Sequence, residues 1–158
     1  MRKLIVIVAV SMCIISCKKD KENINVNSSA NIENTTQKGS ILIEELPFPE
    51  EVTECACYFA KDQSDFNSEK YIYVDDAGEN AFAKLDGERR TMKLISSSSF
   101  EDDSESIIKE IESNEYKISI KAKKIKENPE AMVFEGTMTV EQPTGEKVTT
   151  PIYGECAC

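Results

Sequence analysis

The residues best suited to chemistry in this sequence are four cysteines, arranged as two Cys-Ala-Cys tripeptides. Cys55 and Cys57 form the first pair, and Cys156 and Cys158 form the second pair about a hundred residues later. A glutamate precedes each pair. Four thiolates could hold zinc, a reactive pair could exchange disulfides, and oxidised cysteines could join two strands.

The spacing of the four cysteines favours structural disulfides. Residues i and i+2 of a strand point to the same face, so each tripeptide presents both sulfurs together. Zinc knuckles usually separate their cysteines by two residues in a turn, and redox-active cysteines need cations nearby, whereas acidic neighbours raise the pKa of a thiol. A bridge within one extended tripeptide is disfavoured, because its side chains lie about 6.5–7 Å apart. We predict two bridges between the tripeptides and no metal; the sequence leaves open Cys55–Cys158 with Cys57–Cys156, or Cys55–Cys156 with Cys57–Cys158.

Other catalytic groups are scarce. The chain contains no histidine, which removes the commonest general base and the Ser-His and Cys-His nucleophile pairs. It also lacks a glycine-rich phosphate loop and a Gly-x-Ser-x-Gly turn. We interpret the adjacent acids Asp75/Asp76 and Asp102/Asp103 as solvated turn formers and not as an acid–base pair. These observations predict a protein that is not an enzyme and has no cofactor.

A row of lysines forms a local positive stripe on an acidic chain. Lys117, Lys121 and Lys123 alternate along one run, with Lys124 and Lys126 nearby. One interpretation is a solvated strand face that also protects a sheet edge from pairing. The other is a docking stripe for an anionic glycan or an acidic protein.

Most of the domain shows an alternation of apolar and polar residues with period two, which is typical of half-buried strands. This alternation predicts the strands that carry the cysteines and the lysines. Turn signals separate the alternating runs at hairpin spacing, at residues 75–80, 85–88, 127–130 and 142–146. A further run at 40–46 is either an eighth strand or an edge piece. The seven main runs occupy residues 54–60, 70–76, 81–85, 91–96, 116–123, 132–140 and 147–158.

One segment has a different pattern. Ile107, Ile108 and Ile111 follow the candidate helix caps Asp102, Asp103 and Ser104. This spacing predicts one short helix over residues 104–112, or else a mobile loop. The whole pattern predicts a mainly β domain, a small antiparallel meander barrel or sandwich of seven to eight strands with one short helix.

The first seventeen residues have the order of an export signal. Arg2 and Lys3 precede an apolar run of about twelve residues, which is too short to span a bilayer and suits a signal peptide. The run ends in Ile-Ile-Ser-Cys at Cys17, which resembles the lipobox of bacterial lipoproteins. This resemblance implies that residues 1–16 are removed and that Cys17 carries the lipid anchor.

The composition of the segment after Cys17 predicts a flexible tether. Lys18 to Glu22 resembles the export signal of Bacteroidota lipoproteins, with a plain solvated linker as the alternative. The following residues are rich in Asn, Ser and Thr and bury too little apolar surface to fold. We therefore divide the chain into a signal peptide at 1–16, a lipidated cysteine and flexible tether at 17–39, and a single β-rich domain at 40–158. The expected location is the outer membrane, facing either the periplasm or the cell surface.

The net charge constrains the partners. It is −10 for the full chain, and loss of Arg2 and Lys3 with the signal peptide makes it about −12. Such a charge disfavours nucleic acid, because phosphate binding needs basic surfaces. It suits a cationic protein partner, although solubility alone would also explain it.

A small, cysteine-tied β-barrel on a bacterial lipoprotein is similar in general to the membrane-bound inhibitors of C-type lysozyme. The inhibitory Ser-Gly-x-x-Tyr loop of that family has no counterpart here, so no site residues are transferred. We predict a non-catalytic envelope lipoprotein that acts as a binding or inhibitor-like module. The alternatives are a structural or assembly lipoprotein without a soluble ligand and, less favoured, a thiol or carboxylate enzyme.

Overall fold

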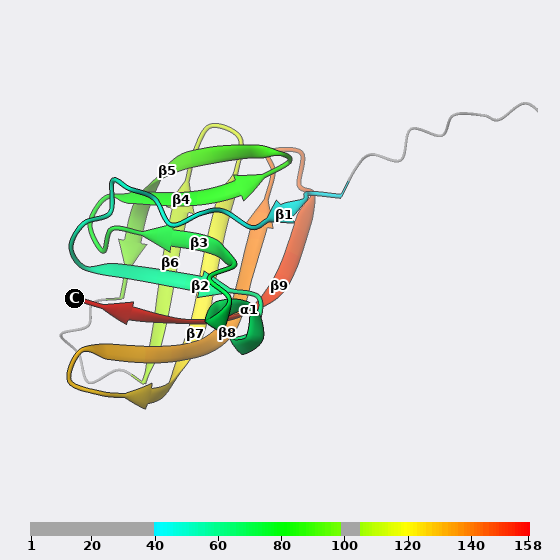
Figure 1. Ribbon diagram of the computed structural model, residues 1–158. Helices are drawn as coiled ribbons and strands as arrows, with labels where there is room; N and C mark the ends of the chain where they lie inside the picture. Colours follow the sequence, from blue (N-terminus) through cyan, green and yellow to red (C-terminus); the bar gives the residue numbers. More distant parts are fainter. Residues whose placement is uncertain (1–39, 99–104) are drawn as a thin grey trace, which may run out of the picture. The chain divides into compact units, whose positions relative to one another are not determined.

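The computed structural model describes residues 40–98 and 105–158, which form nine strands and one helix (Figure 1). The short strand β1 (Ile43–Glu44) comes first and the helix α1 (Gln63–Asn67) follows the second strand. The other strands are β2 (Ala56–Ala60), β3 (Tyr71–Asp75), β4 (Asn80–Leu85), β5 (Glu88–Ser97), β6 (Ser106–Glu112), β7 (Lys117–Glu127), β8 (Ala131–Glu141) and β9 (Lys147–Ala157).

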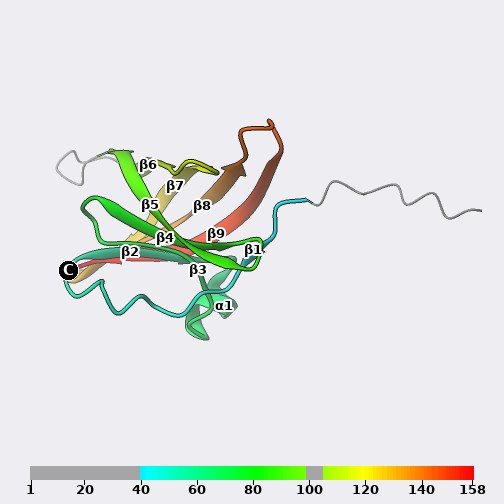
Figure 2. The same cartoon turned by 90° about the horizontal axis from the view of Figure 1, so that it is seen from above.

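Eight of these strands close into an up-and-down barrel. Each strand from β2 to β9 pairs antiparallel with the next one along the chain, and β9 pairs with β2 to complete the ring (Figure 2). The short strand β1 lies outside this ring and pairs with the end of β4. The prediction of an antiparallel meander is confirmed, and of the two forms left open, the structure adopts the barrel.

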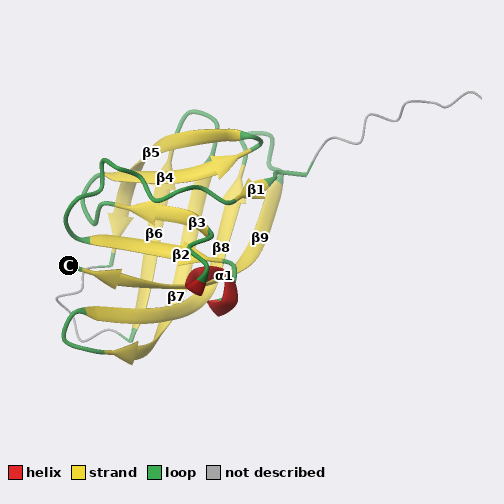
Figure 3. Ribbon diagram, viewed as in Figure 1, coloured by secondary structure: helices red, strands yellow, loops and turns green. Residues whose placement is uncertain are grey.

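The predicted strands are all present, but the predicted helix is misplaced. The sequence predicts a short helix or a mobile loop over residues 104–112, whereas 106–112 form strand β6, and the helix of the structure is α1 instead (Figure 3). Ile107, Lys109 and Ile111 all point into the barrel core. The lysine in the middle hides the alternation of this strand, so the pattern is easily mistaken for a helical one. The candidate caps Asp102 to Ser104 lie outside the described residues.

The predicted turns coincide with hairpins. The β4–β5 turn consists of Asp86 and Gly87, which both have positive φ angles, of 51° and 85°. Two consecutive left-handed residues match the twist of the strands in a two-residue hairpin, and Asp-Gly is among the sequences best suited to it. The segments 75–80, 127–130 and 142–146 join β3 to β4, β7 to β8 and β8 to β9.

The barrel interior is filled with apolar side chains from every barrel strand. Burying them removes apolar surface from water, which is the main favourable contribution to folding. Gly154 on β9 allows close contact with β2, because a Cβ there would lie 2.0 Å from the carbonyl oxygen of Tyr58. The largest fully buried residues include Phe59, Tyr73, Leu85, Met92, Ile111, Ile118, Ile120, Phe134 and Met138.

A second, smaller apolar cluster lies outside the barrel. The segment between β1 and β2 crosses the outer face of β2, β3 and β4 (Figure 1). Its Leu46 and Val52 are buried against Ala56, Val74 and Phe82. This segment therefore covers part of the outer sheet surface that would otherwise be exposed to water. No helix within the described residues is long and apolar enough to cross a membrane.

Candidate functional site

The four domain cysteines form two disulfides across the seam between β2 and β9. The bridges are Cys55–Cys158 and Cys57–Cys156. Cys57 and Cys156 are direct partners in the antiparallel register, which explains why this pairing forms and the alternative pairing does not. The prediction of two structural disulfides is confirmed. The inner bridge is buried, whereas Cys158 of the outer bridge is exposed.

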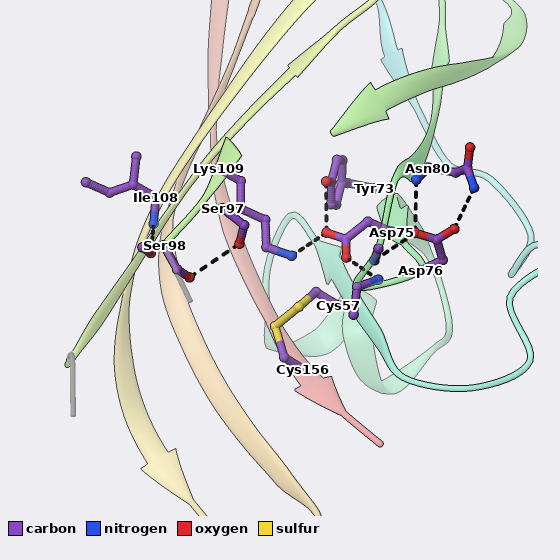
Figure 4. Close-up of polar contacts among 12 residues, drawn as sticks. Cys57, Tyr73, Asp75, Asp76, Asn80, Ser97, Ser98, Ile108, Lys109 and Cys156 are labelled. Carbon is purple, nitrogen blue, oxygen red and sulfur yellow. Dashed lines mark hydrogen bonds and ion pairs between the residues drawn. A yellow bond between two sulfur atoms is a disulfide. The ribbon is translucent and has the colours of Figure 1, made fainter. Parts of the chain in front are cut away.

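A buried ion pair lies next to the inner disulfide. Asp75 neighbours Cys57 across the β2–β3 pair, and its side chain points into the barrel (Figure 4). Lys109 from β6 donates to Asp75 Oδ2 at 2.5 Å, and the hydroxyl of Tyr73 donates to the same oxygen at 2.9 Å. Asp75 is 0% exposed and Lys109 is 1% exposed. Burial and the nearby Asp75 carboxylate raise the pKa of Tyr73 well above its usual value.

The two acids of the β3–β4 turn have separate roles. Asp76 accepts hydrogen bonds from the backbone N–H groups of Gly78 and Asn80 and from the Asn80 side chain, as expected of a turn former. These bonds outweigh the opposing effect of burial and lower the pKa of Asp76. The prediction is wrong for Asp75, which is a core residue paired with Lys109. Sequence spacing gave no sign that a lysine from β6 reaches it.

A hollow of about 630 Å³ opens at the end of the barrel that carries the disulfides. Its lining comes from the start of β2, the β3–β4 turn, the β7–β8 hairpin and the end of β9. We call it the barrel mouth. Among the described residues, four carboxylates line it and no lysine or arginine does; the carboxylates belong to Glu54, Asp76, Glu127 and Glu130.

The charges of the barrel mouth are only partly compensated. Glu127 pairs with Lys124 at 2.5 Å, and Asp76 is occupied by its turn. Glu54 and Glu130 make no ion pair with another described residue. The barrel mouth is therefore a hollow with excess negative charge, and the rigid disulfide seam forms one of its walls.

The predicted lysine stripe lies on the outer face of β7, and acids on β6 neutralise part of it. Lys117 lies 3.5 Å from Glu110 and 3.4 Å from Glu112. Hydrogen bonds and charge from these two glutamates raise the pKa of Lys117. Lys123 lies 3.9 Å from Glu105, whereas Lys121 makes no ion pair within the described part of the chain. This pattern favours the interpretation as a solvated strand face.

A second hollow, which the sequence did not predict, lies on the outer surface beside the same seam. It measures about 660 Å³ and is lined by Phe48, Tyr58 and Tyr71, together with Glu54 and Glu69. We call it the aromatic groove. It shares Glu54, Ala56, Ala157 and Cys158 with the lining of the barrel mouth.

The aromatic groove is backed by the helix α1. Phe66 of α1 stacks on Tyr58, with centroids 5.6 Å apart and planes within 8°. Phe66 also contacts the Tyr153 ring on β9, at 5.5 Å between centroids. Five aromatic rings from five different segments thus form a connected cluster, of which Phe48, Tyr58 and Tyr71 line the groove. No local sequence motif could have indicated this cluster.

No known protein family, curated protein or solved structure matches this chain. The fold and the site therefore define the class without help from relatives: a small up-and-down barrel, closed by two disulfides, with two acid-lined hollows beside its seam. Within residues 40–98 and 105–158, no group of three or more Cys, Asp or Glu side chains is arranged to hold a metal ion. The signal peptide, the lipidation site Cys17 and the tether lie outside the described residues and stay predictions.

Proposed function

We propose that this protein is a non-catalytic binding module of the bacterial envelope that captures a cationic protein. The observation that carries the proposal is the barrel mouth, a hollow of about 630 Å³ that, within the described part of the chain, is lined by four carboxylates and by no lysine or arginine. A concave acidic surface attracts basic partners and speeds their association. The net charge of −10 adds a long-range attraction for the same basic partners.

The remainder of the barrel supports binding more than catalysis. Its interior is filled by side chains, so a small substrate would have no room in the core. The four domain cysteines are held in disulfides and offer no thiolate nucleophile. A rigid, pre-formed surface lowers the entropic cost of binding a protein partner.

The envelope location rests on the sequence. The lipobox at Cys17 and the Asn- and Ser-rich tether would hold the barrel at the outer membrane. Replacement of Cys17 by Ala should abolish incorporation of radiolabelled palmitate and release the protein from washed membranes. Unchanged labelling and membrane retention in this variant would contradict the proposed anchor.

The binding function is tested with the mature chain, residues 17–158, used as bait in envelope extracts at increasing salt. Glu127→Gln with Glu130→Gln removes two charges from the barrel mouth. The matched control, Glu135→Gln with Glu146→Gln, removes two charges from residues that do not line either hollow.

We expect the bait to retain a basic protein at low salt, and the mouth variant to retain much less of it than the control variant. Screening of exposed charges should weaken retention as salt rises. Recovery of no basic protein at any salt concentration would contradict the proposal and favour a structural lipoprotein. Equal loss in both variants would show that net charge acts without the barrel mouth.

A further inference from the structure

Three aromatic rings line the aromatic groove and pack against one another edge to face. The Tyr58 ring meets the edges or faces of Phe48 and Tyr71 at near right angles, with centroids 5.4 and 5.3 Å away. Phe48 and Tyr71 are themselves 5.9 Å apart at 78°. The three rings therefore contact one another, and all three line a hollow of about 660 Å³. Phe48 remains 39% exposed, so these rings are not sealed in a core.

The electrostatics of the aromatic groove are negative. Glu54 and Glu69 line it, and no lysine or arginine of residues 40–98 and 105–158 does. The Tyr58 hydroxyl donates to Glu155, which places a third carboxylate beside this ring. Burial, followed by the charges of Glu69 and Glu155, raises the pKa of Tyr71.

The combination of aromatic rings and carboxylates in the groove favours one class of ligand over others. An apolar ligand would cover the carboxylates without replacing their hydration, which is unfavourable. An anion would be repelled by the same groups. A cation gains from both features, because ring faces attract positive charge and desolvation strengthens that attraction.

We propose that the aromatic groove binds a lysine or arginine side chain of a basic peptide segment. This deepens, and rests on, the proposed capture of a cationic protein, because it assigns a specific contact to that partner. The two hollows share the wall formed by Glu54, Ala56, Ala157 and Cys158. One basic segment that crosses this wall can place a side chain in the aromatic groove and further positive charge over the barrel mouth.

The direct test uses short peptides with blocked ends, Gly-Arg-Gly and Gly-Lys-Gly, titrated into the mature chain. Binding is followed by NMR shifts of the Tyr58 and Tyr71 ring protons. The neutral analogues Gly-citrulline-Gly and Gly-acetyl-lysine-Gly match the charged peptides in size. We expect shifts with the charged peptides and far smaller ones with the neutral peptides.

Three variants localise the binding. Tyr71→Leu and Phe48→Leu keep apolar bulk but remove a ring, and each should weaken binding of the charged peptides by roughly 3- to 30-fold. Tyr153→Leu is the matched control, because that ring contacts Phe66 but does not line the aromatic groove. Circular dichroism and thermal unfolding check the fold of each variant. If Tyr71→Leu does not fold, the more exposed Phe48→Leu decides.

Several outcomes would overturn this proposal. Equal binding of neutral and charged peptides would show that the positive charge is not recognised. A loss of peptide binding in Tyr153→Leu as large as in the groove variants would show that the binding site is not the aromatic groove. Binding of tetramethylammonium without binding of either charged peptide would assign the groove to small quaternary amines.

The two proposals fail separately. If the bait retains a basic protein through Glu127 and Glu130 while the peptides do not bind, the groove assignment is wrong and the proposed function stands. If the peptides bind through Phe48 but no basic protein is retained, the groove assignment stands and the proposed function is wrong.

Discussion

Lys109 is the least expected residue of the barrel core, because its ammonium group lies among apolar side chains and faces one carboxylate. It comes from β6 and contacts Asp75 on β3, and two strands separate β6 from β3 around the barrel. The contact therefore spans the interior. Two charges removed from water are costly unless they are paired and hydrogen-bonded, and here Tyr73 and the N–H of Ala77 complete the partners of Asp75.

Replacement of Lys109 by Met should lower the free energy of unfolding by about 3–5 kcal/mol, because it leaves the Asp75 carboxylate buried without its cation. Lys109→Met combined with Asp75→Asn should recover part of this loss, since the asparagine is neutral and still accepts a hydrogen bond. Urea unfolding measures both effects. Lys121→Met on the exposed face is the control and should change stability by less than about 0.5 kcal/mol.

Asp86 gives the barrel a defined pH dependence. The backbone N–H of Leu42 donates to Asp86 at 2.8 Å and the hydroxyl of Tyr116 donates at 2.6 Å, which lowers the pKa of Asp86 in the folded protein. A lowered folded pKa means that this contribution to stability is present above about pH 4. It is lost as the pH falls further, through the folded pKa.

Asp86→Asn should therefore reduce the loss of stability between pH 5 and pH 2. Asparagine tolerates the positive φ of the β4–β5 turn, so the hairpin geometry is kept. Urea unfolding midpoints across this pH range give the measurement. A loss as large in the variant as in the parent would show that the Asp86 hydrogen bonds do not contribute to the pH dependence.

At the scale of the elements, the sequence predicted the strands better than the site. Alternation located the runs that became β2 to β5 and β7 to β9, and Asp-Gly located the sharpest turn. It failed for β6, because the buried Lys109 breaks the apolar alternation and only the distant Asp75 explains it. The total of eight barrel strands includes β6 and excludes the marginal β1. The predicted number of strands therefore agrees with the structure better than the predicted positions of the individual strands do.

The candidate site was only half predictable. Two Cys-Ala-Cys tripeptides at strand spacing were enough to predict the seam. The aromatic groove was not, since its rings come from segments far apart in the sequence. Phe48 precedes β2, Tyr58 and Tyr71 lie on β2 and β3, and Phe66 belongs to a helix that no pattern indicated. Only the three-dimensional structure places these rings together.

The β2–β9 contact depends on the absence of a side chain at Gly154. Gly154→Ala should destabilise the barrel by about 1–3 kcal/mol or more, because the added methyl would overlap the backbone of Tyr58 and the ring of Phe59. Gly78→Ala in the β3–β4 turn is the matched substitution, since a Cβ there would lie 3.2 Å from an Asp76 side-chain oxygen and 3.7 Å from the Asp76 carbonyl oxygen, without the overlap found at Gly154. Thermal unfolding should separate the two variants clearly.

At the scale of the whole barrel, the two disulfides have the same structural role. Both connect the start of β2 with the end of β9, the outer one through residues that directly flank these strands, across 103 and 99 residues of sequence. Once one bridge has closed this long loop, the other closes a loop of only a few residues and adds little further restriction to the unfolded chain. Their contributions to stability should therefore not be additive.

Alanine replacement of Cys55 with Cys158, or of Cys57 with Cys156, should each cost far less than replacement of all four. The chain-entropy model assigns about 4–5 kcal/mol to the first closure of a loop of about a hundred residues. The inner pair should cost more than the outer pair, because its removal also leaves a void in the core. Unfolding free energies that simply add would contradict this account.

The long span of both bridges also sets an order of events while the barrel forms. Under the proposed export, the chain enters an oxidising compartment from its amino end, and Cys55 and Cys57 arrive with about a hundred residues still to come. Neither has its partner until β9 has followed, so β2 must wait with one open edge and two reactive thiols. An oxidase that acts too early can only form a mixed disulfide or a wrong link. The correct disulfides can therefore form only after the last strand has paired with β2, so their presence shows that the barrel has closed.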